Sequence, residues 1–186
     1  MSIAVAARPR ASPRLEHKRA PPALGAVAAD GTFEGYASLF DLPDLGRDIV
    51  RPGAFARSIT RRGVQGIKLL WQHEAAQPIG RWLEIKEDSR GRFVRGQLNL
   101  EVARARELLS LLREGAVDGL SIGYRAEKAR TDRKSGLRQL LQVDLWEISL
   151  VTFPMLPQAR VSAVKHAGHA SKHLLESIRN ATRVMR

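Results

Sequence analysis

Two side chains with the chemistry of a general base and a nucleophile, His73 and Ser121, stand out in this sequence of 186 residues. His73 follows an apolar run that is typical of a strand, and Ser121 lies between Gly119 and Gly123 at the start of another apolar run. A histidine that takes the proton of a serine hydroxyl creates a strong nucleophile. The two residues therefore predict hydrolysis by an activated serine. Taken singly, the histidine also fits a structural residue bonded to a backbone carbonyl, and the serine fits a small residue at a tight crossing.

A carboxylate in an apolar strand is the candidate for the third member of such a site. Alternation along residues 143–153 puts Glu147 on the same face as Leu145 and Val151, so we expect its carboxylate to be partly buried. A buried carboxylate needs a positive or hydrogen-bonding partner. An imidazole N–H is suitable, and orienting a basic histidine is the task of a catalytic acid. An ion pair with an arginine explains Glu147 equally well, and Asp144 and Asp118 are the alternative acids.

The remaining histidines lie toward the two ends of the chain. His166, His169 and His173 have a spacing that would place them on one face of a helix, which is a pattern able to bind a transition metal. No cysteine accompanies them, and we interpret them as the solvated face of a tail. The sequence therefore predicts no metal and no cofactor.

Charge and composition separate the two ends from the middle of the chain. Residues 1–24 carry five arginines and lysines against one acid, and residues 157–186 carry six against one. Basic ends of this kind contact polyanions or acidic protein surfaces, or they are merely soluble. The chain has no cysteine, no apolar run long enough to span a bilayer and no signal-peptide pattern at its start, so we expect an intracellular protein without a membrane segment.

The pattern of apolar residues predicts a mainly β or α+β fold, specifically an antiparallel β-barrel, closed or partly closed, with surrounding helices. Residues 1–29 are rich in Ala, Pro and Arg and are expected to be a disordered basic arm. Residues 30–165 form the folded domain, and residues 166–186 form a basic tail. We expect strands over 32–40, 67–72, 81–87, 92–100, 120–124, 140–153 and 160–164, and helices over 54–61, 102–112 and 171–185.

The order of these elements argues against an α/β-hydrolase. Gly119-Leu120-Ser121-Ile122-Gly123 matches the nucleophile-elbow pattern of that fold, which requires a strand before the serine and a helix after it. Here the expected helix precedes the serine and the expected strand follows it.

Several short stretches together resemble the prohead serine proteases of tailed phages, the enzymes that mature procapsids. The resemblance covers about residues 31–165, and the ordered set is much more specific than any one of its parts. The stretches are Phe33-Glu34-Gly35-Tyr36-Ala37, Arg47-Asp48-Ile49-Val50, Pro52-Gly53-Ala54-Phe55, Trp71-Gln72-His73, Pro78-Ile79-Gly80, Gly119-Leu120-Ser121-Ile122-Gly123-Tyr124 and Trp146-Glu147-Ile148-Ser149-Leu150-Val151 with Pro154.

The resemblance implies a fold similar to that of the herpesvirus assemblin proteases, with residues 30–165 as the protease domain. It implies that His73 is the base and Ser121 the nucleophile. Herpesvirus relatives use a second histidine as the third residue, and this core offers none. Glu147 is our assignment, which rests on the strand argument above and on its motif. Backbone N–H groups near Ser121 or Gly123 are expected to bind the oxyanion.

By the same resemblance, the substrates are the scaffolding region of the major capsid protein and the protease itself. The enzyme would work inside the assembling procapsid, in the cytoplasm of a bacterial host. Because disordered ends thread easily into an active cleft, we also expect the basic ends to be cleaved during activation; the alternative is that they guide packaging against acidic scaffold segments. An esterase is a weaker alternative, and two other interpretations stay open. One is a catalytically silent module of capsid assembly that binds the scaffold, and the other is a nucleic-acid-binding protein, which the low aromatic content of 5% argues against.

Overall fold

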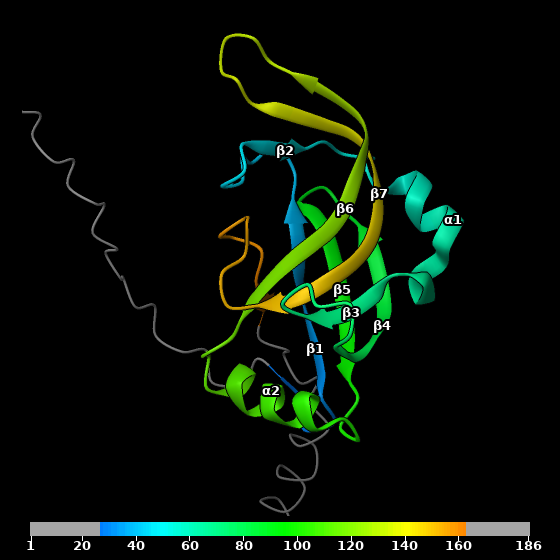
Figure 1. The fold of residues 1–186 in the computed structure, drawn as a ribbon, viewed down its shortest axis with the longest axis vertical. Helices are drawn as coiled ribbons and strands as arrows, with labels where there is room; N and C mark the ends of the chain where they lie inside the picture. Colours follow the sequence, from blue (N-terminus) through cyan, green and yellow to red (C-terminus); the bar gives the residue numbers. More distant parts are fainter. Residues whose placement is uncertain (1–26, 163–186) are drawn as a thin grey trace, which may run out of the picture.

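The computed structural model describes residues 27–162 of the chain. This part contains eight strands and two helices, joined by turns and loops. Their arrangement is drawn in Figure 1. In chain order they are β1 (Thr32–Leu39), β2 (Asp48–Val50), α1 (Ala56–Gly66), β3 (Lys68–Trp71), β4 (Pro78–Glu87), β5 (Gly91–Leu98), α2 (Ala103–Arg113), β6 (Gly119–Thr131), β7 (Arg138–Val151) and β8 (Val161–Ser162).

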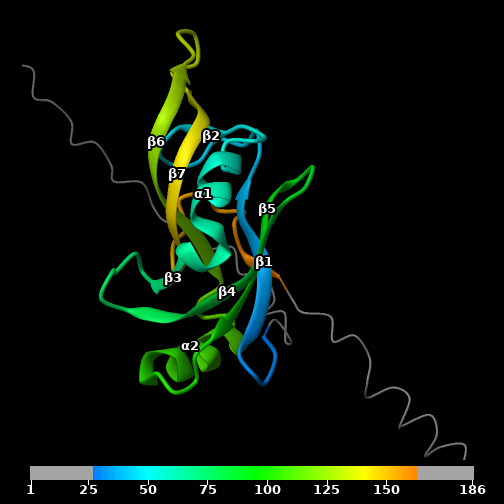
Figure 2. The same ribbon diagram turned by 90° about the vertical axis from the view of Figure 1, so that its right-hand side faces the viewer.

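The long strand β7 connects the two halves of the sheet. One of its edges pairs with β6 in an antiparallel hairpin, and its other edge pairs with β2 and β3, which both run parallel to it. From β3 the sheet continues through β4, β5 and β1 to β8, with antiparallel neighbours throughout. The β6–β7 hairpin extends well beyond the rest of the fold in both views (Figures 1 and 2).

The expected mainly β class is confirmed, but the expectation of a wholly antiparallel barrel is wrong. The sheet is mixed and curls into a half-barrel, because β2 and β3 pair parallel to β7. Helix α1 lies between these two strands in the sequence, and such a crossover lets successive strands run in the same direction. At one end, Arg160 bridges the two sides of the curl: its carbonyl accepts from the backbone N–H of Tyr36 in β1, and it forms a bridge with Gly119 in β6.

The larger of two hydrophobic clusters in residues 27–162 forms the core of the curled sheet. The Trp82 ring packs edge-on against Phe33, with centroids 5.7 Å apart, and both side chains are buried. Helix α2 adds Ala105, Leu108 and Leu112, whose spacing puts them on one face of the helix. Gly115 has a positive φ of 71° and follows the end of that helix, a position where glycine is common.

Most of the expected elements are present, with shifted ends. The strand β2 has no counterpart among the expected elements, and β4 begins at Pro78, three residues before the strand expected over 81–87. The disordered arm and the basic tail lie outside the described residues, except that Val27, placed in the arm, is buried and forms a bridge with Phe33. Within residues 27–162 no helix is long and apolar enough to cross a membrane.

Candidate active site

His73 lies in the turn that follows β3, in a backbone conformation that few residues adopt. Gln72 and His73 both have positive φ angles, 51° and 63°. Such angles are uncommon outside glycine, and they persist only where the surroundings fix them. Here the backbone N–H of Gln72 donates to the carbonyl of Leu150, and that of His73 donates to Ser149 Oγ at 3.1 Å. The turn is therefore bonded at two points to β7, and this aims the imidazole along the strand.

The hydroxyl of Ser121 lies against one nitrogen of that imidazole. His73 Nε2 and Ser121 Oγ are 2.9 Å apart, within hydrogen-bond distance. Ser121 is the third residue of β6 and is 5% exposed, whereas the side chain of His73 is 41% exposed. The serine is therefore fixed in the sheet, and the histidine reaches it from the solvent side.

Glu147 contacts the other nitrogen of the same imidazole. Its Oε1 lies 2.6 Å from His73 Nδ1, and its Oε2 accepts a hydrogen bond of 2.6 Å from the hydroxyl of Ser149. Ser149 is fully buried and thus holds the acid through its hydroxyl, which also accepts from the backbone of His73. The structure brings His73, Ser121 and Glu147 into one hydrogen-bonded row.

A β-bulge turns Glu147 toward this row. Gly123 pairs with Glu147, but the next residue of β6, Tyr124, pairs with Leu145, so Trp146 has no opposite residue. Leu145 belongs to the hydrophobic core, and the extra residue reverses the alternation, so that Glu147 lies on the opposite face. The expected burial of Glu147 is found, with 9% exposed, but the expectation that it shares a face with Leu145 is wrong.

The carboxylate raises the pKa of the His73 imidazole above its ordinary value of 6.5. The hydrogen bond from His73 to Glu147 is the largest cause, and the negative charge of Glu147 adds to it, whereas partial burial acts in the opposite direction. The arrangement therefore favours a histidine that accepts a proton readily.

Gly123 leaves the space that the Glu147 carboxylate occupies. A Cβ atom built at this position would lie 1.9 Å from Glu147 Oε1, the oxygen that contacts His73. Two non-bonded atoms cannot approach so closely. The second glycine of the Gly-x-Ser-x-Gly pattern is thus required by the acid and not by the turn of a nucleophile elbow.

Substitution of Gly123 by alanine is expected to lower kcat/KM for a peptide substrate about 100-fold, because the carboxylate must swing away from His73, and a displacement near 1 Å can have an effect of this size. Steady-state kinetics with a fluorogenic peptide would measure it. Gly46→Ala is the matched control, since the three atoms nearest to its Cβ would be side-chain atoms of Asp44 and Met155, at 3.2 Å or more. Activity of Gly123→Ala within twofold of the control would contradict the placement of Glu147.

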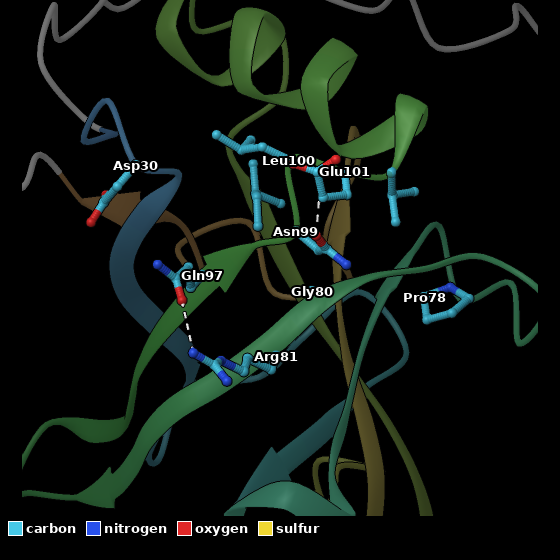
Figure 3. Close-up of a pocket in the computed structure, with 10 residues that line it drawn as sticks. Asp30, Pro78, Gly80, Arg81, Gln97, Asn99, Leu100 and Glu101 are labelled. Carbon is cyan, nitrogen blue, oxygen red and sulfur yellow. Dashed lines mark hydrogen bonds between the residues drawn. The ribbon is translucent and has the colours of Figure 1, made fainter.

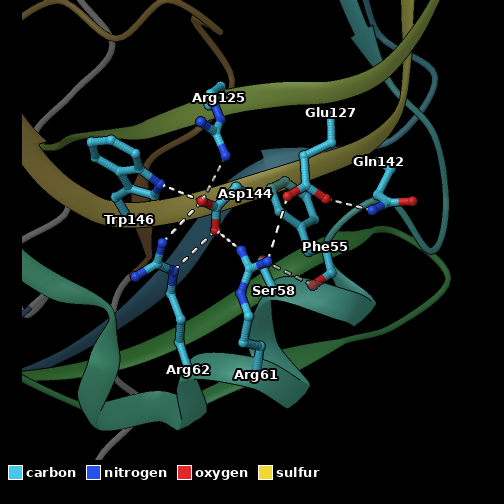
Figure 4. A network of polar contacts seen from close by, with 9 residues as sticks. All are labelled: Phe55, Ser58, Arg61, Arg62, Arg125, Glu127, Gln142, Asp144 and Trp146. Carbon is cyan, nitrogen blue, oxygen red and sulfur yellow. Dashed lines mark hydrogen bonds and ion pairs between the residues drawn. The ribbon is translucent and has the colours of Figure 1, made fainter.

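The two alternative acids are engaged elsewhere. Asp144 contacts Arg61, Arg62 and the Trp146 indole (Figure 4). These hydrogen bonds hold the pKa of Asp144 far below the usual range, and the one from Arg62 has the largest effect. Asp118 pairs with Arg160. Neither carboxylate contacts His73. The three histidines considered as metal ligands, His166, His169 and His173, lie outside the described residues.

Sequence reasoning missed Ser149 and the role of Gly123. Both could be recognised only from the pairing of β6 with β7. In that pairing Ser149 lies opposite Ser121, and Gly123 lies opposite Glu147. A small residue opposite a long polar one indicates that the long side chain leans across the neighbouring strand.

A cavity of about 700 Å³ lies away from this row, where the start of β4 and the end of β5 meet α2 (Figure 3). Polar groups of Arg81, Gln97, Asn99 and Glu101 line it, whereas His73, Ser121 and Glu147 do not. The candidate site is thus on the surface of the β6–β7 pair and not in this cavity.

Comparison with known proteins agrees with the expected resemblance. Residues 22–173 match the family model described as caudovirus prohead serine protease. The chain is 34% identical over 137 residues to the prohead protease of Enterobacteria phage HK97, covering 73% of this chain and 60% of that protein. It is 31% identical over 132 residues to the capsid polyprotein of Pseudomonas phage PAJU2, covering 66% of this chain and 18% of that protein. The chain therefore spans about three fifths of one relative and less than a fifth of the other.

Solved structures of viral proteases are also similar to this chain. The bacteriophage T4 capsid assembly protease shares the fold, with a TM-score of 0.53 at 12% identity, covering 64% of this chain and 80% of that chain. The KSHV protease, solved with a hexapeptide phosphonate inhibitor, aligns with a TM-score of 0.48 at 12% identity, covering 80% of this chain and 76% of that chain.

Proposed function

Because this chain belongs to the family of caudovirus prohead serine proteases, we propose that it is a serine endopeptidase of procapsid maturation in which Ser121, His73 and Glu147 perform the reaction. The observation that carries the proposal is the row of contacts at 2.9 Å from Ser121 Oγ to His73 Nε2 and at 2.6 Å from His73 Nδ1 to Glu147. A nucleophile, a base and an orienting acid are the parts that acyl transfer by a serine requires.

The reaction begins when Ser121 Oγ attacks the carbonyl carbon of the scissile peptide bond. His73 Nε2 takes the hydroxyl proton as the new C–O bond forms, and the negative charge of Glu147 stabilises the resulting imidazolium. His73 then gives the proton to the leaving amine, and the C–N bond breaks to leave an ester on Ser121. Water, deprotonated by the same imidazole, attacks this ester; the C–O bond to the serine breaks, and His73 returns the proton to Ser121 Oγ.

The outer edge of β6 offers the substrate a place to bind in extended form. Among the described strands only β7 pairs with β6, and on the other edge Arg160 bridges Gly119 alone. Within residues 27–162, backbone groups beyond Leu120 on that edge face no partner strand. An extended peptide can pair with such an edge, which would carry its carbonyl past Ser121.

The substrates we propose are the scaffolding region of the major capsid protein and the chain itself, whose basic ends would be removed on activation. A relative named as a capsid polyprotein supports a capsid protein as the partner. The place of action would be the interior of the assembling procapsid in a bacterial host.

Labelling with a fluorophosphonate tests the proposed chemistry. An activated serine displaces fluoride and forms an O–P bond, so mass spectrometry of the purified protein is expected to find one adduct, on Ser121. Ser110 provides an internal control, because it is exposed on α2 and its hydroxyl donates to Glu114 instead of contacting a histidine. Absence of labelling on Ser121, or equal labelling of Ser110, would favour a catalytically silent assembly module.

Co-expression with the capsid protein of the same phage or prophage tests the substrate. We expect the capsid protein to lose its scaffolding segment only when the protease is present. Full-length capsid protein beside a protease that fluorophosphonate labels would contradict the proposed substrate and leave the proposed chemistry intact.

The raised pKa of His73 predicts the acid side of the pH profile. Only the neutral imidazole can take the proton of Ser121, so kcat/KM falls as the pH falls through the pKa of His73 in the free enzyme. The midpoint of that fall is expected above 6.5, the ordinary value for histidine. Initial rates at low substrate concentration between about pH 5 and pH 9 would measure it, and a midpoint at or below 6.5 would contradict the influence of Glu147 on the base.

A further inference from the structure

Three arginines converge on the carboxylate of Asp144, beside the candidate active site (Figure 4). We call this group the arginine cluster; it consists of Arg61 and Arg62 on α1, Arg125 on β6, and Asp144 and Trp146 on β7. Arg61 and Arg62 make close ion pairs within the fold, whereas Arg125 is mostly exposed. We therefore consider a structural role for the first two and a binding role for Arg125.

Arg61 and Arg62 have a structural explanation. Arg62 donates twice to the nearly buried Asp144, at 3.0 and 2.9 Å, and Arg61 contacts both Asp144 and Glu127. Two-bond pairs of this kind fix geometry as well as adding energy. These contacts attach α1 to the β6–β7 hairpin, and the attachment satisfies the charge of Asp144.

Arg125 has no such explanation. Its guanidinium comes no closer than 3.9 Å to Asp144, which is beyond hydrogen-bond distance, and its side chain is 69% exposed. The oxygens of Asp144 already accept from Arg61, Arg62 and the Trp146 indole. The donors of Arg125 are therefore open to solvent at the edge of the cluster.

Trp146 also exposes much of its side chain within the cluster. It is the bulged residue of β7, 52% of it is exposed, and its indole N–H donates to Asp144 at 2.7 Å. The guanidinium of Arg62 lies 5.8 Å from the centre of its ring. The cluster thus presents a flat apolar surface beside an excess of positive charge, since three guanidinium groups face only the carboxylates of Asp144 and Glu127 within the described residues.

The cluster lies along the same pair of strands as the catalytic row. Ser121, Gly123 and Arg125 alternate along β6, and their opposite residues on β7 are Ser149, Glu147 and Asp144. Arg125 follows Ser121 by four positions, so the two residues lie about 13 Å apart along the strand. A peptide extended along the edge of β6 has the same rise, so a side chain about four residues from the scissile bond would reach Arg125.

We propose that Arg125, with Trp146 beside it, binds a carboxylate side chain of the substrate about four residues from the bond that is cleaved. The inference rests on the proposed endopeptidase function and adds a substrate preference to it. A planar guanidinium matches a carboxylate in shape and charge, and the indole covers the methylene groups that carry the carboxylate.

Cleavage of a proteome-derived peptide library tests the subsite, because the library does not require the cleavage sequence to be known in advance. Wild type is expected to enrich Asp and Glu at one position, three to five residues from the scissile bond. With synthetic peptides from that set, Glu→Gln at this position is expected to lower kcat/KM roughly twofold to fivefold, the upper range of an exposed ion pair. Arg125→Glu is expected to exchange the acidic preference for Lys and Arg at the same position.

Arg130→Glu is the matched control, because it makes the same charge change on an exposed residue farther along β6. It is expected to keep the acidic preference of wild type. A library without acidic enrichment, or an acidic preference unchanged in Arg125→Glu, would overturn the subsite while cleavage itself upholds the proposed function. A wild-type enzyme that cuts no peptide would overturn both.

Discussion

Substitution of Ser121 by alanine is expected to lower kcat for peptide cleavage by about 10⁴-fold to 10⁶-fold, the effect of losing the nucleophile in other serine proteases. The loss is this large because, in the proposed mechanism, His73 and Glu147 act only through the hydroxyl of Ser121. In cells that also produce the capsid protein, this protein is expected to keep its full length.

The fold of this variant is expected to be retained. Ser121 lies in the β6–β7 ladder, and its hydroxyl contacts a histidine that is 41% exposed, so removing one oxygen leaves no buried polar group unpaired. We expect the free energy of unfolding to change by about 1 kcal/mol or less. Thermal unfolding followed by circular dichroism would measure this.

Ser110→Ala supplies the matched control, as the same chemical change on the exposed face of α2. It is expected to cleave at the wild-type rate. If Ser121→Ala retained a tenth or more of wild-type kcat while folded, the assignment of the nucleophile would be wrong.

Local patterns in the sequence, together with the family resemblance, single out the residues of the candidate site but not the way the chain joins them. The apolar run before His73 and the alternation around Ser121 and Glu147 are properties of single strands, and each predicts a strand in the right place. The pairing of β2 and β3 along one edge of β7 depends on contacts between distant segments. A strand as short as β2, with three residues, has too little alternation to be recognised.

The orientation of the acid also depends on non-local structure. The bulge at Trp146 is a property of the pairing between β6 and β7, and the residue type at this position does not predict it. The positive φ angles of Gln72 and His73 also cannot be predicted from residue type, since neither residue is a common turn former. Hydrogen bonds from this turn to Leu150 and Ser149 hold it in place, and these partners are far away along the chain.

Substitution of Glu147 by glutamine is expected to lower kcat by about 10⁴-fold, as loss of the orienting carboxylate does in other serine proteases. The amide has nearly the same size, so the contact with Ser149 Oγ and the space above Gly123 are kept. Its neutral oxygen no longer stabilises the imidazolium of His73, and its NH₂ group can favour the wrong tautomer of the ring. Pre-steady-state kinetics would show whether the formation of the acyl-enzyme is the step that slows.

The pH dependence separates this role from a merely structural one. The pKa of His73 is raised chiefly by its bond to Glu147, so the imidazole of Glu147→Gln is expected to titrate at lower pH than that of wild type, as NMR of His73 would measure. Asp118→Asn removes another carboxylate near the start of β6 without touching His73, since Asp118 pairs with Arg160. We expect this control to keep both the rate and the midpoint. A Glu147→Gln variant with an unchanged midpoint would mean that the carboxylate supports the turn but not the base.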